Sequence, residues 1–266
     1  MDKEDIKRLG NDPRFISGIH NYCDRWCERC PFTARCMNFA MGEEQFADPE
    51  TQDLNNEAFW EKLSETFQVT LDLLKEMAEE AGVDLDSLDI EEAKEEENYR
   101  KEVAESHKCS RAARAYGKTV DEWFDSAIEM FGQKEDESER QARPGIPSIG
   151  PLAEDTTLAD TTQVIRWYQH QIYVKIMRAV HGSLKEESEE LDEFPRDSDG
   201  SAKVALIGID RSISAWGEMR GFFPMLENSI LDILVHLERL RRQTENTFPA
   251  AREFIRPGFD KVKLNG

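Results

Sequence analysis

Residues 224–240 read PMLENSILDILVHLERL. Apolar side chains recur in this stretch every three or four residues, which is the spacing of one face of an α-helix. Pro224 stands at the first position of the expected helix, where a missing backbone N–H is tolerated. The stretch therefore predicts a long amphipathic helix, and its apolar stripe consists of Met225, Ile230, Ile233, Leu234, Leu237 and Leu240.

The same periodicity extends over most of the chain, which contains neither a hairpin signal between alternating strands nor a βαβ rhythm. Capping patterns such as Thr119-Val-Asp-Glu122 mark where several helices should begin. Further helices are predicted at about 12–22, 56–80, 89–117, 119–131, 160–182, 183–194 and 201–216. The chain is therefore expected to have an all-α fold, a multi-helix bundle with an N-terminal cysteine-rich metal-binding loop.

Composition divides the chain into four regions. Residues 1–50 form a cysteine-rich segment expected to pack on the body, and residues 51–135 form an acidic helical region. Residues 136–158 are rich in Pro and Gly, which predicts a linker or a covering loop because regular helix is disfavoured there. Residues 159–266 form a C-terminal helical region.

The charge of the chain is strongly negative and unevenly distributed. The formal net charge is -21, and residues 43–105 hold 22 Asp and Glu against 5 Lys and Arg. Such a surface repels phosphate groups, so nucleic acid and anionic membranes are unlikely partners. The first residues lack the apolar core of a signal peptide and no apolar run is long enough to span a membrane, which predicts a cytoplasmic protein.

Four of the five cysteines are close together in the sequence. Cys23, Cys27, Cys30 and Cys36 follow the pattern CxxxCxxCxxxxxC, and only Cys109 lies elsewhere. Where thiols stay reduced, so tight a group predicts a metal centre rather than disulfides. Structural zinc sites usually combine two separated pairs of cysteines, whereas iron–sulfur clusters accept thiolates from one wrapped loop. A [4Fe-4S] cluster is therefore the favoured cofactor, and Zn is the alternative.

Part of this segment resembles a known cluster loop. Cys27-x-x-Cys30-Pro-x-x-x-x-Cys36 is similar to the end of the [4Fe-4S] loop of endonuclease III-type DNA glycosylases. Cys23 departs from that pattern, because three residues separate it from Cys27 where that family has six. The resemblance covers about 14 of 266 residues and implies a cluster loop, not DNA repair.

The first three cysteines also have the spacing of radical S-adenosylmethionine enzymes, but three features argue against that class. A helical chain cannot supply the β/α barrel of those enzymes. Arg29 stands where they usually have an aromatic residue, and Cys36 would occupy the iron that their chemistry leaves open.

Residues between the cysteines are candidates for supporting roles. Arg25, Arg29 and Arg35 would offset the negative charge of a thiolate cluster, or would be ordinary surface charges. Trp26 and Phe32 would shield the centre from solvent, or would simply anchor the core.

The C-terminal half contains candidates for a second site. Asp232 and His236 are four residues apart, so they share a helix face and could ligate a metal or contact each other. Asp210 and Arg211 follow an apolar run, which predicts a buried ion pair or a ligand-binding role. The expected ion-pair partners are Arg220, Lys203 and His170. Cys109 is expected to be a small buried hydrophobic residue.

Three functions follow from these observations. The first is a [4Fe-4S] cluster-binding helical protein that works in redox chemistry or electron transfer with a protein redox partner. The second is a zinc-binding structural or interaction protein without redox chemistry. The third is an enzyme whose active site lies among the C-terminal helices, with a structural cysteine centre.

Overall fold

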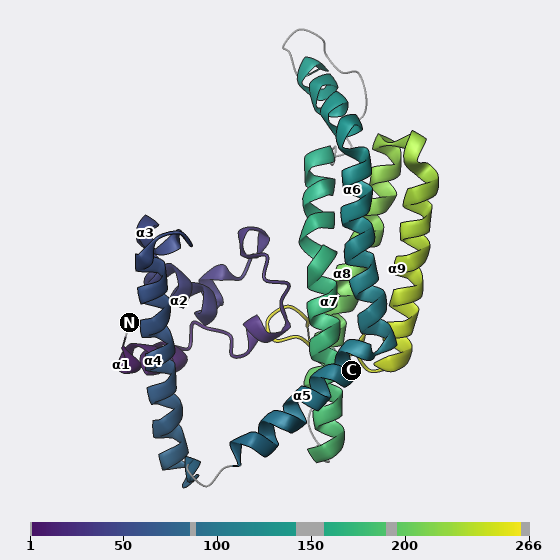
Figure 1. The fold of residues 1–266 in the computed structure, drawn as a ribbon. Coiled ribbons are helices and arrows are strands. Elements are labelled where there is room, and N and C mark those ends of the chain that lie inside the picture. Colours follow the sequence, from purple (N-terminus) through teal and green to yellow (C-terminus); the bar gives the residue numbers. More distant parts are fainter. Residues whose placement is uncertain (1, 86–88, 142–156, 190–195, 262–266) are drawn as a thin grey trace. The chain divides into compact units, whose positions relative to one another are not determined.

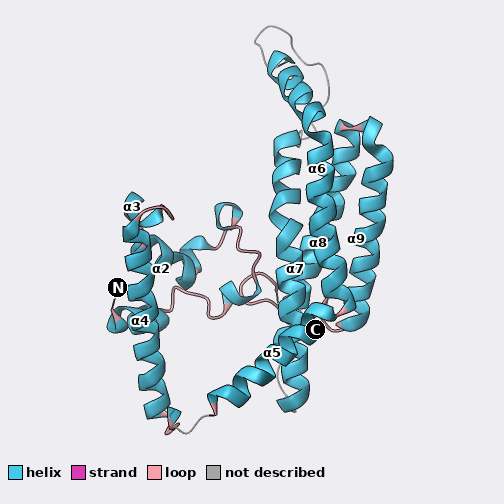
Figure 2. Ribbon diagram, viewed as in Figure 1, coloured by secondary structure: helices cyan, strands magenta, loops and turns pink. Residues whose placement is uncertain are grey.

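The computed structural model describes residues 2–85, 89–141, 157–189 and 196–261. In these ranges the chain forms helices and turns but no strand, which confirms the predicted all-α class (Figure 2). The chain divides into two compact units. Unit 1 consists of residues 1–98 and 255–266, and unit 2 runs from Tyr99 to Phe254.

Unit 2 is built around a bundle of four long helices, α6 (Lys108–Gln141), α7 (Leu158–Glu189), α8 (Asp197–Phe222) and α9 (Glu227–Thr247). Each helix packs on the next, and α6 packs on α9 to close the bundle (Figure 1). Half of α8 is buried, 13 of its 26 residues, so α8 contributes most to the core. The helix predicted from residues 224–240 is α9, preceded by a 3₁₀ turn at Pro224–Leu226.

Aromatic side chains join the helices at the centre of the bundle. The indole of Trp216 is fully buried and donates from Nε1 to the hydroxyl of Tyr116 at 3.1 Å. The ring of Trp123 meets that of Trp216 edge-on, with 4.9 Å between the centroids. Gly208 lets α7 approach α8 closely, because a Cβ at this position would lie 3.0 Å from the ring of Tyr168.

The first helix boundary predicted in unit 2 was wrong. A helix was expected to end near Gly117 and another to begin at Thr119, but α6 runs continuously through both. The break falls at His107 instead, between α5 (Ile90–Ser106) and α6, where His107 Nδ1 accepts from the N–H of Cys109 at 3.2 Å. Gly117 serves helix packing, because Gln169 donates to its carbonyl at 2.8 Å and a Cβ would contact α7.

Two other boundaries also differ from the prediction. Helix α7 continues through His181 and Gly182 to Glu189, and α8 begins at Asp197 rather than at Ser201. Asp197 and Asp199 lie in the first turn of α8, where acidic side chains favour the helix dipole. Of the Pro/Gly-rich region expected at 136–158, residues 136–141 belong to α6 and residues 142–156 lie outside the described ranges.

Unit 1 contains α1 (Lys3–Gly10), α2 (Met37–Gln45), α3 (Pro49–Gln52) and α4 (Glu57–Glu80), and α5 crosses from it into unit 2. Helix α4 matches the predicted range 56–80, with an N-cap in which Asn56 Oδ1 accepts from the N–H of Ala58 at 3.0 Å. None of its residues is buried, although its apolar side chains recur at helical spacing. The helix predicted at 12–22 reduces to one 3₁₀ turn, Ile19–Tyr22.

A search of the described residues for a helix long and apolar enough to cross a membrane finds none.

Candidate metal centre

The four clustered cysteines open onto a single cavity of about 30 Å³ in unit 1. Its walls also include the side chains of Ile19, Trp26, Phe32, Phe39 and Phe259. His20 and Asp24, which sequence reasoning did not single out, line the same cavity. The structure therefore gathers the predicted thiols at one place, in largely apolar surroundings.

Short 3₁₀ turns position the cysteines. Cys23 follows the turn Ile19–Tyr22, Cys27 begins the turn Cys27–Arg29, and Cys30 ends it by donating its N–H to the carbonyl of Cys27 at 3.1 Å. Cys36 in the same way follows the turn Thr33–Arg35 and occupies the N-cap of α2. The positive end of the α2 dipole therefore lies at Cys36.

Arg25 turns the chain between the first two cysteines. Its φ is +60°, and it is the non-glycine residue with positive φ in the described part of the chain. A left-handed residue with a Cβ is strained by roughly 1 kcal/mol or more, so surrounding contacts must hold it in place. The N–H of Cys27 donates to the Arg25 carbonyl at 3.0 Å, which closes this tight turn.

The four thiols are near enough to influence one another. Burial raises the pKa of the Cys27 thiol, and repulsion from Cys23, Cys30 and Cys36 raises it further. The N–H of Phe32 donates to Cys30 Sγ at 3.4 Å, whereas Cys23 Sγ donates to the carbonyl of His20 at 3.4 Å.

Residues from the C-terminal end of the chain complete the cavity wall. Phe259 packs edge-on against Phe32, with 5.1 Å between the ring centroids. Arg256 holds this segment in shape by donating to both carboxylate oxygens of Asp260, at 3.0 and 3.1 Å. Gly258 has φ +77°, and a Cβ there would lie 2.9 Å from Ile16 and Ile19. No local sequence pattern signals this contact, because more than 200 residues separate Phe32 from Phe259.

Trp26 and Phe32 line the cavity, as does Arg25, and all three arginines between the cysteines are exposed. Trp26 is only 7% exposed, and the Arg29 guanidinium lies over its ring at 4.3 Å from the centroid. Arg35 contributes its carbonyl, which accepts from the N–H of Ile16 at 3.0 Å and ties the segment to the preceding loop. These contacts stabilise the conformation of the loop, and the exposed guanidinium groups of Arg29 and Arg35 place positive charge on its surface.

In the described residues, no group of three or more His, Cys, Asp or Glu side chains is arranged so that it could hold a metal ion. This statement covers the four cysteines, whose side chains line one cavity without meeting around a single point.

Asp232 and His236 do not form a second site in the structure. His236 Nε2 hydrogen-bonds the carbonyl of Ala112 at 2.8 Å, and its ring stacks on Tyr116 with 6.4 Å between centroids. Asp232 is exposed on α9. His236 therefore joins α9 to α6 as a structural residue.

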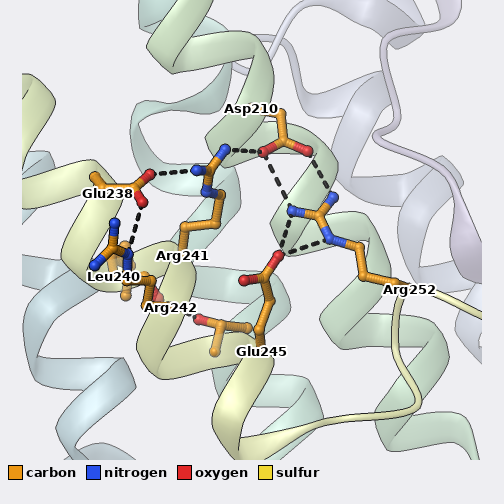
Figure 3. Close-up of polar contacts among 8 residues, drawn as sticks. Asp210, Glu238, Leu240, Arg241, Arg242, Glu245 and Arg252 are labelled. Atoms are coloured by element: carbon orange, nitrogen blue, oxygen red, sulfur yellow. Dashed lines mark hydrogen bonds and ion pairs between the residues drawn. The ribbon is translucent and has the colours of Figure 1, made fainter.

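Asp210 forms ion pairs, but with partners other than those predicted. Its carboxylate contacts Arg252 at 2.6 Å and Arg241 at 3.6 Å, and Glu245 contacts Arg252 at 2.8 Å (Figure 3). The expectation of a buried pair with Arg220, Lys203 or His170 was wrong, because Asp210 lies at a half-exposed position facing α9. Arg211 donates to the hydroxyl of Tyr168. Both residues are thus engaged in joining helices.

Cys109 is buried, as predicted, and its Sγ lies 3.6 Å from Thr247 Oγ1. It belongs to unit 2, apart from the four clustered cysteines of unit 1.

Comparison of the chain with models of protein families, with curated proteins and with solved structures finds no match.

Proposed function

We propose that Cys23, Cys27, Cys30 and Cys36 hold a [4Fe-4S] cluster and that the protein works in redox chemistry or electron transfer. The observation that carries this proposal is that all four thiols line one cavity whose other walls are largely aromatic and aliphatic. Four thiolates are the ligand set of such a cluster, and when bound it supplies one-electron transfer.

The spacing of the four cysteines along the chain favours a cluster over a single ion. Sulfurs that share one Zn²⁺ at 2.3 Å must lie about 3.8 Å apart in a tetrahedron. A cube of four irons takes one thiolate at each corner, so it accepts sulfurs that are spaced more widely around a cavity.

The surrounding residues would tune the centre in three ways. The N–H of Phe32 and the N-terminus of α2 would stabilise negative charge on the thiolates of Cys30 and Cys36. Trp26 and Phe259 would exclude water from the cavity. The exposed arginines would partly offset the negative charge of the centre, which raises a reduction potential.

Metal and sulfide analysis of protein purified without oxygen tests this proposal. We expect a brown protein with about four irons and four sulfides per chain, since that is the composition of the cluster. Replacing any of the four clustered cysteines by Ser should reduce the iron content, whereas the control Cys109→Ser should not. A colourless protein with one zinc per chain would instead establish the structural zinc alternative.

A further inference from the structure

Helix α4 exposes a continuous apolar stripe that its own unit leaves uncovered. The side chains of the stripe are 51–62% exposed and consist of Trp60, Phe67, Leu71, Leu74 and Met77. They recur every three, four or seven residues, so they share one face of the helix. The opposite face lies against α1 and α3, and Lys7 on α1 pairs with Glu76 at 2.5 Å. Large apolar patches of this kind mark interaction sites on folded proteins.

The stripe is anchored in place before any partner binds. The indole Nε1 of Trp60 donates to the carbonyl of Leu54 at 2.9 Å, which satisfies its polar atom. Phe59 packs edge-on against the Trp60 ring at 5.1 Å and also contacts Phe46 at 5.9 Å. A fixed aromatic anchor loses little conformational entropy on binding, which favours its use in an interface.

Acidic residues follow one edge of the stripe and decide which partner fits it. Glu57, Glu61 and Glu79 are exposed and lie on the same side of α4, with Lys75 as the basic residue among them. Their carboxylates would repel an anionic membrane surface. A second copy of the chain would bring the same carboxylates to the interface, and like charges brought together oppose pairing.

We propose that this stripe is the docking site for an amphipathic helix of a partner protein whose apolar face is flanked by Lys or Arg. Helices recognise one another by apolar residues at three- and four-residue spacing, which the stripe provides. Complementary charge along the edge speeds association and selects against acidic partners. This interaction does not depend on the identity of the metal at the cysteine centre.

Binding of two fluorescent helical peptides to the full-length protein, followed by anisotropy, tests the proposal. The peptides share one leucine face and differ only in carrying Lys or Glu along its edge. We expect the Lys peptide to bind at least about tenfold more tightly than the Glu peptide. Substituting Phe67→Ser and Leu71→Ser together should weaken its binding about tenfold or more, because both are central in the stripe.

Two further variants test whether binding depends on this stripe and on the acidic residues at its edge. Met225→Ser removes an 89% exposed apolar side chain of unit 2 and should leave peptide binding unchanged. Reversing the edge with Glu57→Lys, Glu61→Lys and Glu79→Lys should transfer the preference to the Glu peptide. Circular dichroism of each variant shows whether its helices are retained.

Three results would overturn the proposal. Binding that the Phe67 and Leu71 substitutions leave unchanged would mean that the peptide binds elsewhere. If the wild type sediments as a dimer and the Phe67 and Leu71 substitutions make it a monomer, the stripe binds a second copy of the chain. A monomer that binds neither peptide would show that the stripe is covered within the chain.

Discussion

Cys27 begins the second turn of the cysteine segment, and its thiol responds to the other three. Burial and the neighbouring thiols both disfavour its thiolate, so the pKa of Cys27 lies above that of an ordinary cysteine. Because only the thiolate reacts with an alkylating agent, the raised pKa should make metal-free Cys27 react slowly at neutral pH.

We expect the alkylation rate of Cys27 in metal-free protein to rise only at higher pH than in the urea-unfolded chain. Cys30→Ser or Cys36→Ser should move the profile part of the way back, since burial remains when one repelling thiol is removed. Trypsin cuts after Arg25, Arg29 and Arg35, so mass spectrometry can follow each cysteine in its own peptide. Identical profiles in the folded and unfolded chains would contradict this account.

Tyr116 links the stability of unit 2 to pH. Burial raises the pKa of its hydroxyl from 10.0 to about 12, although hydrogen bonds with Ser212 and Trp216 oppose the shift. Between these values the unfolded chain loses the phenol proton and the folded chain keeps it, so stability falls as the pH rises above 10. A shift of this size corresponds to roughly 3 kcal/mol in the alkaline limit.

Urea unfolding at a series of alkaline pH values tests this linkage. The Tyr116→Phe variant should be less stable than the wild type at pH 8, because Trp216 loses its hydrogen-bond acceptor. Above pH 10 the difference between the two proteins should shrink, since the variant has no phenol to ionise. A difference that stays constant would mean that Tyr116 is not what makes stability pH-dependent.

At the scale of elements, periodicity predicted α4 and α9 well but could not predict what each of them packs against. The stripes of the two helices look alike in sequence, yet α9 buries Ile230, Ile233, Leu237 and Leu240 in the bundle, whereas α4 leaves its stripe exposed. Met225, which was predicted to belong to the first of these stripes, lies before α9 and is exposed. Gly117 is a residue type that often ends helices, and the sequence predicted a helix end there. Only its close packing on α7 shows why a glycine lies inside α6. Likewise, the cysteine spacing predicted the grouping of the thiols, whereas Phe259 arrives from the far end of the chain.

The turn that carries Phe259 depends on Gly258. Comparison with Gly82 separates the effect of left-handed backbone strain from that of a steric clash. Gly258 and Gly82 have φ of +77° and +70°, but only Gly258 would place a Cβ 2.9 Å from other side chains. Gly82→Ala should therefore cost only left-handed strain, about 1–2 kcal/mol. Gly258→Ala should cost more, because the methyl group also collides with Ile16 and Ile19.

Loss of iron to a chelator measures how this turn affects the proposed cluster. We expect Gly258→Ala to release iron faster than the wild type, because Phe259 no longer closes the cavity wall. Gly82→Ala, which lies outside the cavity lining, should release iron at the wild-type rate. Equal rates in all three proteins would mean that Phe259 does not protect the centre.

At the scale of the whole molecule, the chain leaves unit 1 after Asn98 and returns to it at Ile255. Both ends of the chain therefore belong to the unit that carries the cysteines, while the bundle is one continuous insertion between them. A ligand that binds only the folded form stabilises the unit that holds it. Removing the proposed cluster should consequently loosen unit 1 and spare the bundle.

Hydrogen exchange of the protein with and without the proposed cluster tests this division. Exchange should speed up in residues 12–46 and in 255–261, which supply the cavity walls, and should stay unchanged in α6–α9. Cys109→Ser serves as a control, because this substitution in unit 2 should leave the cluster bound and the exchange of residues 12–46 unchanged. Equal loosening of α6–α9 would mean that the units unfold together, and unchanged exchange in 12–46 would mean that the cysteine segment holds its shape without metal.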